Sequence, residues 1–354
     1  MSTLAAPPPA ADPVLPRPPA PTLPPPRGPL GRALHAHWQT GAPLPPPTAP
    51  VDDPLTDDDL HLALWSCYQL HYSGFAEVDD RLEWDPSTLA FRAGLEAQFE
   101  GALRAEHPDH PADDPLAALD DVATWAGPPL ARTIATRGTL DQLREFAIHR
   151  SAYQLKEADA HTWGIPRLAG PGRAAMIEIQ ADEYGDGVPG QAHAELFAEA
   201  MADLGLDPTF GRYVDRLPGV TLATDNLVSM FGLHRRLRGA LVGHLALFEM
   251  CSVLPMSRYL AAARRLGPLP ALERFYAVHV EIDEHHGRLA RDQMAAPVVA
   301  SDPSLGPEVV FGAAALSRCE ARLAGHILGA WDRGRSSLRP PTPAPLVVAG
   351  DGAG

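Results

Sequence analysis

The hydrophobic and polar positions along the chain follow a helical pattern. Apolar residues recur every three to four positions through most of the sequence, and stretches that alternate with a period of two are scarce. Asp57, Asp58 and Asp59 precede the first such segment, and acidic residues are favourable at a helix N-terminus. The pattern predicts one helix that ends near Tyr72 and further helices over about 86–106, 113–126, 138–161, 171–184, 191–204, 224–254, 256–265, 268–293 and 303–333. The sequence therefore predicts an all-α fold.

Proline marks the ends of the chain. Of 39 prolines, 17 fall within residues 1–50, in runs that favour extended and solvated chain over helix. Residues 338–354 have a similar composition. We therefore expect a disordered proline-rich tail over residues 1–50, one helical domain over residues 51–337, and a second disordered tail over residues 338–354.

Charge and cysteine content exclude several classes of function. The chain has 29 basic and 44 acidic residues, a net charge of -15, which argues against binding to nucleic acid or to an anionic membrane. Its three cysteines are far apart and form no CxxC pair, so the sequence predicts neither a zinc ribbon nor a disulfide framework. It contains no signal peptide pattern and no apolar stretch that predicts a transmembrane helix. We expect a cytoplasmic protein.

One helical segment carries a stripe of metal-binding residue types. His279, Asp283 and His286 stand at positions i, i+4 and i+7, and therefore share one side of a helix. Two imidazoles and one carboxylate are the donor set of non-haem iron oxygenases. The stripe predicts a metal site, although histidine and acidic residues also gather on ordinary exposed helix faces.

Other helical segments contain further donors. Glu157 lies in a segment that is otherwise apolar-periodic, and Glu249 has apolar neighbours on both sides, where a carboxylate is costly to bury unless it is paired or metal-bound. Glu183 and His193 bracket the glycine-rich stretch 185–190, which breaks the helix and allows both side chains to turn inward. Donors on facing helices build di-iron and di-manganese sites in helical bundles, and this mixed set favours iron or manganese over structural zinc. His161, four residues after Glu157, is a rival ligand.

Four runs of sequence together resemble a known family. They are Leu155-Lys-Glu157-Ala-Asp-Ala-His161-Thr-Trp163, Glu178-Ile-Gln-Ala-Asp-Glu183-Tyr-Gly-Asp-Gly187, His193-Ala-Glu-Leu-Phe197, and the HxxxDxxH at residues 279–286. Over residues 55–335 the chain resembles the haem-oxygenase-like di-iron oxidases, and within them the bacterial iron-containing redox enzymes.

This resemblance implies a helical bundle like that of haem oxygenase, with two iron ions in place of haem. It implies six ligands, namely Glu157, His193, Glu249, His279, Asp283 and His286. Glu183 matches an extra carboxylate of N-oxygenating members. We therefore expect an O2-dependent oxidase or oxygenase that N-oxygenates or hydroxylates a small molecule. Oxidative C–C cleavage, decarboxylation, a manganese site and a non-catalytic metal-binding helical protein stay open as alternatives, as do a homodimer and the electron donor.

Overall fold

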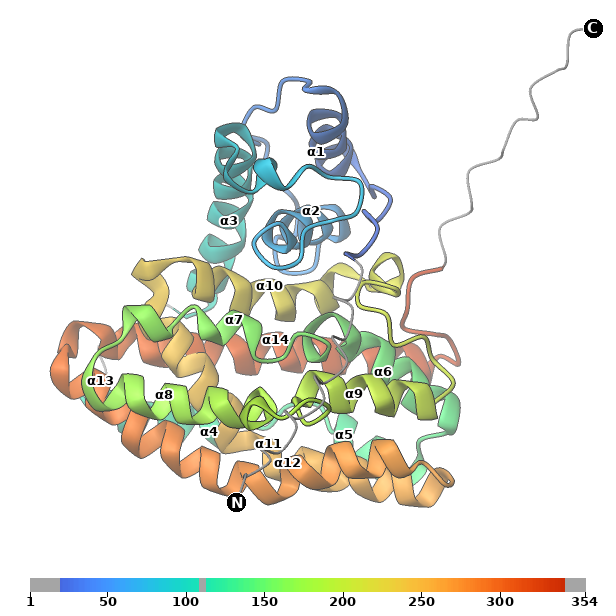
Figure 1. The fold of residues 1–354 in the computed structure, drawn as a ribbon, viewed down its shortest axis with the longest axis vertical. Helices are drawn as coiled ribbons and strands as arrows, with labels where there is room; N and C mark the ends of the chain where they lie inside the picture. The colour runs from blue at the N-terminus through green and yellow to red at the C-terminus, as the bar shows by residue number, and fades with distance from the viewer. Residues whose placement is uncertain (1–19, 108–112, 341–354) are drawn as a thin grey trace, which may run out of the picture.

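The computed structural model describes residues 20–107 and 113–340, and the regular structure in these ranges is entirely helical, with no strand. This confirms the predicted all-α fold (Figure 1). The α-helices are α1 (Pro29–Thr40), α2 (Asp58–Gln69), α3 (Pro86–Glu106), α4 (Pro115–Ala123), α5 (Leu130–Arg137), α6 (Leu140–Gln154), α7 (Asp159–Thr162), α8 (Gly170–Glu183), α9 (His193–Asp203), α10 (Gly219–Leu233), α11 (Arg238–Leu266), α12 (Pro270–Arg288), α13 (Ala296–Ser301) and α14 (Gly306–Asp332). A π-helical turn, Leu289–Ala295, joins α12 to α13. Short 3-10 turns cover Asp80–Trp84, Ile165–Arg167, Gly185–Gly187, Val214–Arg216, Arg235–Leu237 and Pro303–Leu305.

Helix α11 forms the centre of the bundle. It packs against both α12 and α14, while α9 packs on α12 and α10 packs on α2. Gly243 on α11 and Gly312 on α14 lie where these two helices approach most closely. A Cβ atom at Gly243 would lie 1.8 Å from the carbonyl oxygen of Val309, so only glycine permits this approach. Helix α11 thus lies in contact both with α14 and with α12, which carries the predicted metal stripe.

The N-terminal prediction was wrong for residues 20–50, which the structure describes as ordered chain. Pro29 begins α1, and proline suits the first turn of a helix. Leu34 and Trp38, one turn apart, are buried, and the Trp38 indole Nε1 donates to Thr88 Oγ1 at 3.1 Å. The two carboxylate oxygens of Asp59 accept the first backbone N–H groups of α1. The proline-rich composition hid this amphipathic helix; residues 1–19 and 341–354 lie outside the described ranges.

Further differences concern individual helices, and the helix predicted over 138–161 ends at Gln154. The helix predicted over 224–254 is divided at His234, where the chain makes a 3-10 turn between α10 and α11. The helix does not end at Pro255, which lies inside α11. Proline there removes a hydrogen bond to the carbonyl of Cys251, a residue on the exposed side of the helix. Helix α5 was not predicted.

One helical stretch, Arg235–Leu266, is long and apolar enough to cross a membrane. Because 67% of its most apolar window is buried inside the protein, the stretch is explained as the core helix of the bundle.

Candidate metal centre

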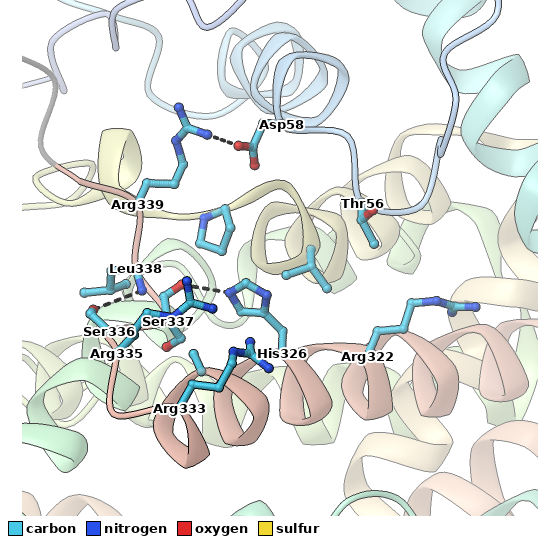
Figure 2. Close-up of a pocket in the computed structure, with 13 residues that line it drawn as sticks. Thr56, Asp58, Arg322, His326, Arg333, Arg335, Ser336, Ser337, Leu338 and Arg339 are labelled. Carbon is cyan, nitrogen blue, oxygen red and sulfur yellow. Dashed lines mark hydrogen bonds and ion pairs between the residues drawn. The ribbon is translucent and has the colours of Figure 1, made fainter.

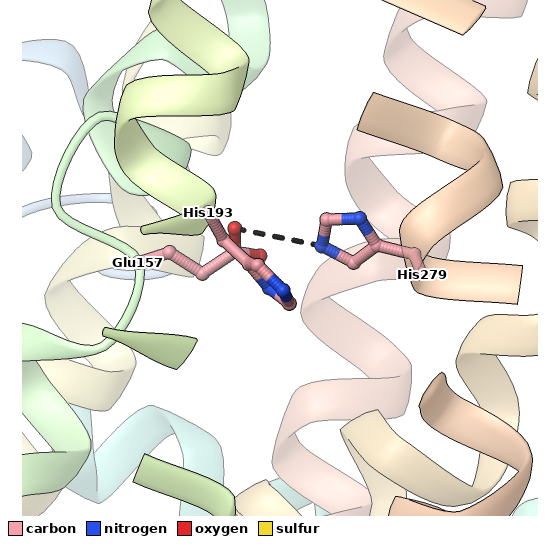
Figure 3. A group of neighbouring side chains, drawn as sticks. All are labelled: Glu157, His193 and His279. Carbon is pink, nitrogen blue, oxygen red and sulfur yellow. Dashed lines mark ion pairs between the residues drawn. The ribbon is translucent and has the colours of Figure 1, made fainter. Parts of the chain in front are cut away.

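Six of the seven predicted ligands form two groups of three buried side chains. Within each group the potential ligand atoms all lie within 4.8 Å of one another. The first group is Glu157, His193 and His279, and Figure 3 shows it with Glu157 and His193 on one side and His279 facing them from α12. The second group is Glu183, Glu249 and His286. The two groups together draw on α8, α9, α11, α12 and the turn after α6.

Glu157 lies in a non-helical turn. Helix α6 ends at Gln154 and α7 begins at Asp159, so the backbone between them is free to direct neighbouring side chains apart. The Lys156 ammonium lies 2.6 Å from the Asp225 carboxylate on α10, and both are buried. Glu157 points instead toward His279, with its Oε2 3.8 Å from the imidazole Nε2. The Lys156–Asp225 ion pair thus anchors the turn that positions Glu157.

The glycine-rich break between α8 and α9 brings Glu183 and His193 together. Gly185, Gly187 and Asp186 all have positive φ angles, which glycine adopts without steric cost and which let the chain reverse within a few residues. As a result Glu183 Oε2, at the end of α8, lies 2.8 Å from His193 Nδ1, at the start of α9. The inward turn expected from the sequence is therefore present in the structure.

Each histidine of the α12 stripe is oriented by a hydrogen bond from the ring nitrogen that faces away from the site. His279 Nδ1 donates to the carbonyl oxygen of Phe275 at 2.7 Å, which leaves Nε2 facing the site. His286 Nε2 donates to Asp182 Oδ2 at 2.8 Å, which leaves Nδ1 facing Glu249 at 3.5 Å. Metal-binding histidines usually donate their other ring N–H to a carbonyl or carboxylate in this way. Asp182 was not identified from the sequence, although it directly precedes Glu183.

Asp283 is buried on the same face of α12 and lines the cavity between the groups. It belongs to neither group of three. Burial raises the pKa of its carboxyl, with the charge of Glu183 acting in the same direction and the charge of His279 against it.

Several donor atoms in the two groups are buried without a hydrogen bond. These are Glu157 Oε2, Glu183 Oε2, His193 Nδ1, His279 Nε2 and His286 Nδ1. Even the 2.8 Å contact between His193 and Glu183 lacks hydrogen-bond geometry. Buried polar atoms are nearly always satisfied, because an unpaired one costs about 1–3 kcal/mol. Carboxylate oxygens and imidazole nitrogens suit iron, so the residues present fit the metal that the donor set predicts.

The electrostatics of the site favour a bound cation. Burial lowers the pKa of His279, but the nearby carboxylate of Glu157 outweighs it and raises this pKa to about 10. Burial likewise opposes protonation of His286, while Glu249 raises its pKa to about 9. Burial, together with the charge of Glu183, raises the pKa of Glu249 to about 7. Without a metal, protons on the imidazoles balance the carboxylates, and a divalent ion would take the place of those protons.

The cavity between the groups has a volume of about 10 Å³, roughly the room that one water molecule needs. Tyr153, Phe248 and Leu245 line it beside the carboxylates. His161 also lines it, but one of its ring nitrogens is hydrogen-bonded to His244 at 3.0 Å, and it belongs to neither group of three. The rival ligand therefore lies at the edge of the site.

Comparisons with known proteins agree with this geometry. The sequence profile of a family described as iron-containing redox enzymes matches residues 144–321, half of the chain. The chain belongs to this family. All seven predicted ligands lie inside the matched region. Membership makes the protein an oxidoreductase that uses iron, confirms the expected haem-oxygenase-like bundle, and implies a small-molecule substrate.

One known protein has a related sequence. The nitrosourea synthase of Streptomyces achromogenes subsp. streptozoticus is 28% identical over 159 residues, which make up 45% of this chain and 34% of that protein. The matched region thus covers about a third of the length of this relative. The similarity places the two proteins in the same superfamily.

Proposed function

We propose that the two groups each hold one iron ion, and that the protein is a non-haem di-iron, O2-dependent oxygenase or oxidase. The observation that carries the proposal is the convergence of six buried side chains in two groups of three, one with a carboxylate and two imidazoles and the other with two carboxylates and an imidazole. Five of the six have a buried ligand atom without a hydrogen bond. Glu157, His193 and His279 would hold one ion, and Glu183, Glu249 and His286 the other. Asp283 would serve as a further ligand from the cavity wall.

Iron bound in such a site supplies the electrons and open coordination positions that O2 activation requires. The protein orients the metal ligands and shields the cavity from solvent. Phe275 and Asp182 hold His279 and His286 with one ring nitrogen toward the site, and the Lys156 ion pair holds the turn that carries Glu157. Tyr153 and Phe248 cover the cavity, whose small volume excludes bulk water.

We propose N-oxygenation of an amine nitrogen, or hydroxylation, as the reaction. Two observations favour it: the similarity to a nitrosourea synthase and the presence of Glu183 as an additional carboxylate in the second group. Because the cavity is far smaller than a substrate, side chains such as Tyr153 and Phe248 must move when the substrate enters. Oxidative C–C cleavage or decarboxylation is the second candidate, since it would use the same iron ligands.

The test is O2 reactivity of the Fe(II)-loaded protein. Anaerobic addition of Fe(II) followed by O2 should consume O2 and produce a transient visible absorption, and His279→Ala should abolish both. His285→Ala is the matched control, because His285 stands on the same helix but is exposed, and this variant should behave like the wild type. Stoichiometric iron binding without O2 uptake would refute the oxygenase function.

The reaction type is tested separately with 18O2. Incubation with amine and with fatty-acid substrates, followed by mass spectrometry, should give products in which 18O is bonded to nitrogen or carbon of the amine. Chain-shortened or decarboxylated products alone would favour the second candidate.

A further inference from the structure

A second pocket lies apart from the metal centre and shares no lining residue with the cavity there. It forms where the C-terminal half of α14 and the segment after it meet the first residues of α10 and the start of α2 (Figure 2). Its volume of about 650 Å³ falls within the range of small-molecule sites, roughly 300–1,000 Å³. The lining residues include Thr56, Asp58, Arg322, His326, Arg333, Arg335, Ser336, Ser337 and Arg339. We call it the arginine pocket.

The charge of the arginine pocket is opposite to that of the whole chain. Four guanidinium groups line it, against the single carboxylate of Asp58, in a protein whose net charge is -15. Asp58 is already engaged, because it accepts the backbone N–H of Gly219 and forms an ion pair with Arg339. Arg322 is paired with Glu106 outside the pocket. The pocket therefore has positive charge in excess.

Two of the guanidinium groups have no partner among the described residues. The side chains of Arg333 and Arg335 are exposed and make neither a hydrogen bond nor an ion pair there, so their donors are open to a ligand from solvent, and Nε of Arg339 is buried without a hydrogen bond. A cation at the C-terminus of α14 would favour the helix dipole, which accounts for Arg333. The helix dipole does not account for the two further arginines, Arg335 and Arg339, that come within seven residues of the end of α14. Both line the same pocket, whose other walls come from α2 and α10.

The wall of the arginine pocket is built before any ligand arrives. The Glu145 carboxylate accepts hydrogen bonds from Ser336 Oγ, from the backbone N–H of Ser337 and from the indole of Trp331. The carbonyl oxygen of Ser337 lies 2.8 Å from His326 Nε2. These bonds fix the segment that carries Arg333, Arg335 and Arg339, so little ordering would be needed for binding.

We propose that the arginine pocket binds a small molecule with at least two negative charges on phosphate or carboxylate oxygens. The planar guanidinium matches both groups with paired N–H donors, and the volume exceeds that of a bare phosphate ion. Arg333 and Arg335 supply the unpaired donors, and Arg339 supplies its free Nε. The proposal does not depend on the reaction at the metal centre.

Isothermal titration of the 354-residue protein tests the proposal. The ligands are pyrophosphate and inorganic phosphate as phosphate compounds, citrate as a carboxylate, and sodium chloride at equal ionic strength. Pyrophosphate or citrate should bind saturably with one site per chain, while sodium chloride should not. Pyrophosphate tighter than citrate assigns the site to phosphates, and the reverse order assigns it to carboxylates. The doubly substituted variant R333Q/R335Q should bind at least tenfold more weakly.

Two further variants separate this site from general charge and from the metal centre. R264Q/R288Q removes two exposed arginines elsewhere and should bind like the wild type. His279→Ala should also retain binding, because the anion does not sit on the metal. Circular dichroism verifies folding of R333Q/R335Q, and R333K/R335K, which keeps the charge but loses the paired donors, should bind with intermediate affinity. Absence of saturable binding in the wild type, or equal binding by R333Q/R335Q, would overturn the proposal.

Discussion

Replacing Glu249 by glutamine should stabilise the metal-free protein and destabilise the metal-loaded one. Glu249 is buried on α11, close to the carboxylates of Glu183 and Asp283 and next to His286. Its pKa is raised from 4.5 to about 7, with burial as the largest cause. That difference corresponds to roughly 3 kcal/mol of unfavourable free energy for the ionised group at pH 8. Glutamine removes this cost but buries an amide at about 1–2 kcal/mol, so we expect a net gain of about 1–2 kcal/mol.

The pH dependence of this gain follows from the direction of the shift. Below pH 4.5 the carboxyl is neutral in both the folded and the unfolded chain, so the charge costs nothing. Between pH 4.5 and about 7 the unfolded chain is ionised while the folded site retains its proton, and the cost grows. Above pH 7 the cost is complete. Glu249→Gln should therefore stabilise the metal-free protein at pH 8 and lose that advantage near pH 5.

Denaturant unfolding of both proteins, at pH 8 and pH 5, with and without anaerobic Fe(II), measures these differences. Iron at one hundred times its dissociation constant stabilises the wild type by about 2.7 kcal/mol per site, so the order of stability should reverse when iron is present. Asp182 and Glu183 remain near His286 in the variant. If Glu249→Gln is more stable with and without iron alike, Glu249 is no ligand and the reasoning fails.

Three further predictions concern the rest of the molecule. Because the pKa of His279 is about 10, metal binding must displace a proton from its imidazole. The affinity for Fe(II) should therefore rise from pH 6 to pH 9 by up to about tenfold per pH unit, and calorimetry should detect proton release. An affinity that does not depend on pH would contradict this. Lys156→Met leaves the Asp225 carboxylate buried and unpaired, and should lower the free energy of unfolding by about 3–5 kcal/mol, measured by chemical denaturation. An equal loss of stability in the Lys156→Met/Asp225→Leu double variant, which removes both charges, would contradict a role of the ion pair. Gly243→Ala places a Cβ against a backbone carbonyl of α14 and should cost about 3 kcal/mol, while Gly101→Ala, which meets nothing within 4 Å, should be neutral or slightly stabilising by thermal denaturation.

The α12 stripe shows what sequence periodicity can predict about a site. Donors at i, i+4 and i+7 share a helix face wherever the helix lies, so the common orientation of His279, Asp283 and His286 follows from local geometry. Glu249 was identified because a carboxylate among apolar neighbours is costly to bury. Both predictions needed only the conformation of one helix.

The grouping of the donors required the tertiary structure. Glu157 faces His279 only because the chain leaves the helical path after Gln154, and no periodicity marks that turn. Glu183 and His193 meet because the chain reverses through a glycine-rich turn, which the composition indicated without giving its direction. Partners that act through backbone atoms, such as the Phe275 carbonyl, have no signature in the sequence.

The N-terminal helix was missed because composition outweighed a short pattern. Proline runs on both sides of α1 suggested disorder, although Leu34 and Trp38 have helical spacing and Pro29 suits a first helical turn. Their burial depends on contacts with distant residues, such as Thr88 on α3, which a local reading does not include. The arginine pocket was hidden for the same reason, since Asp58 and Arg322 reach it from remote parts of the chain.

Iron-edge anomalous diffraction from crystals of the protein loaded anaerobically with excess Fe(II) tests the central claim most directly. We predict two anomalous peaks per chain, one among Glu157, His193 and His279 and the other among Glu183, Glu249 and His286. A peak outside these side chains, or a single ion bound by all six in place of two, would contradict the di-iron centre.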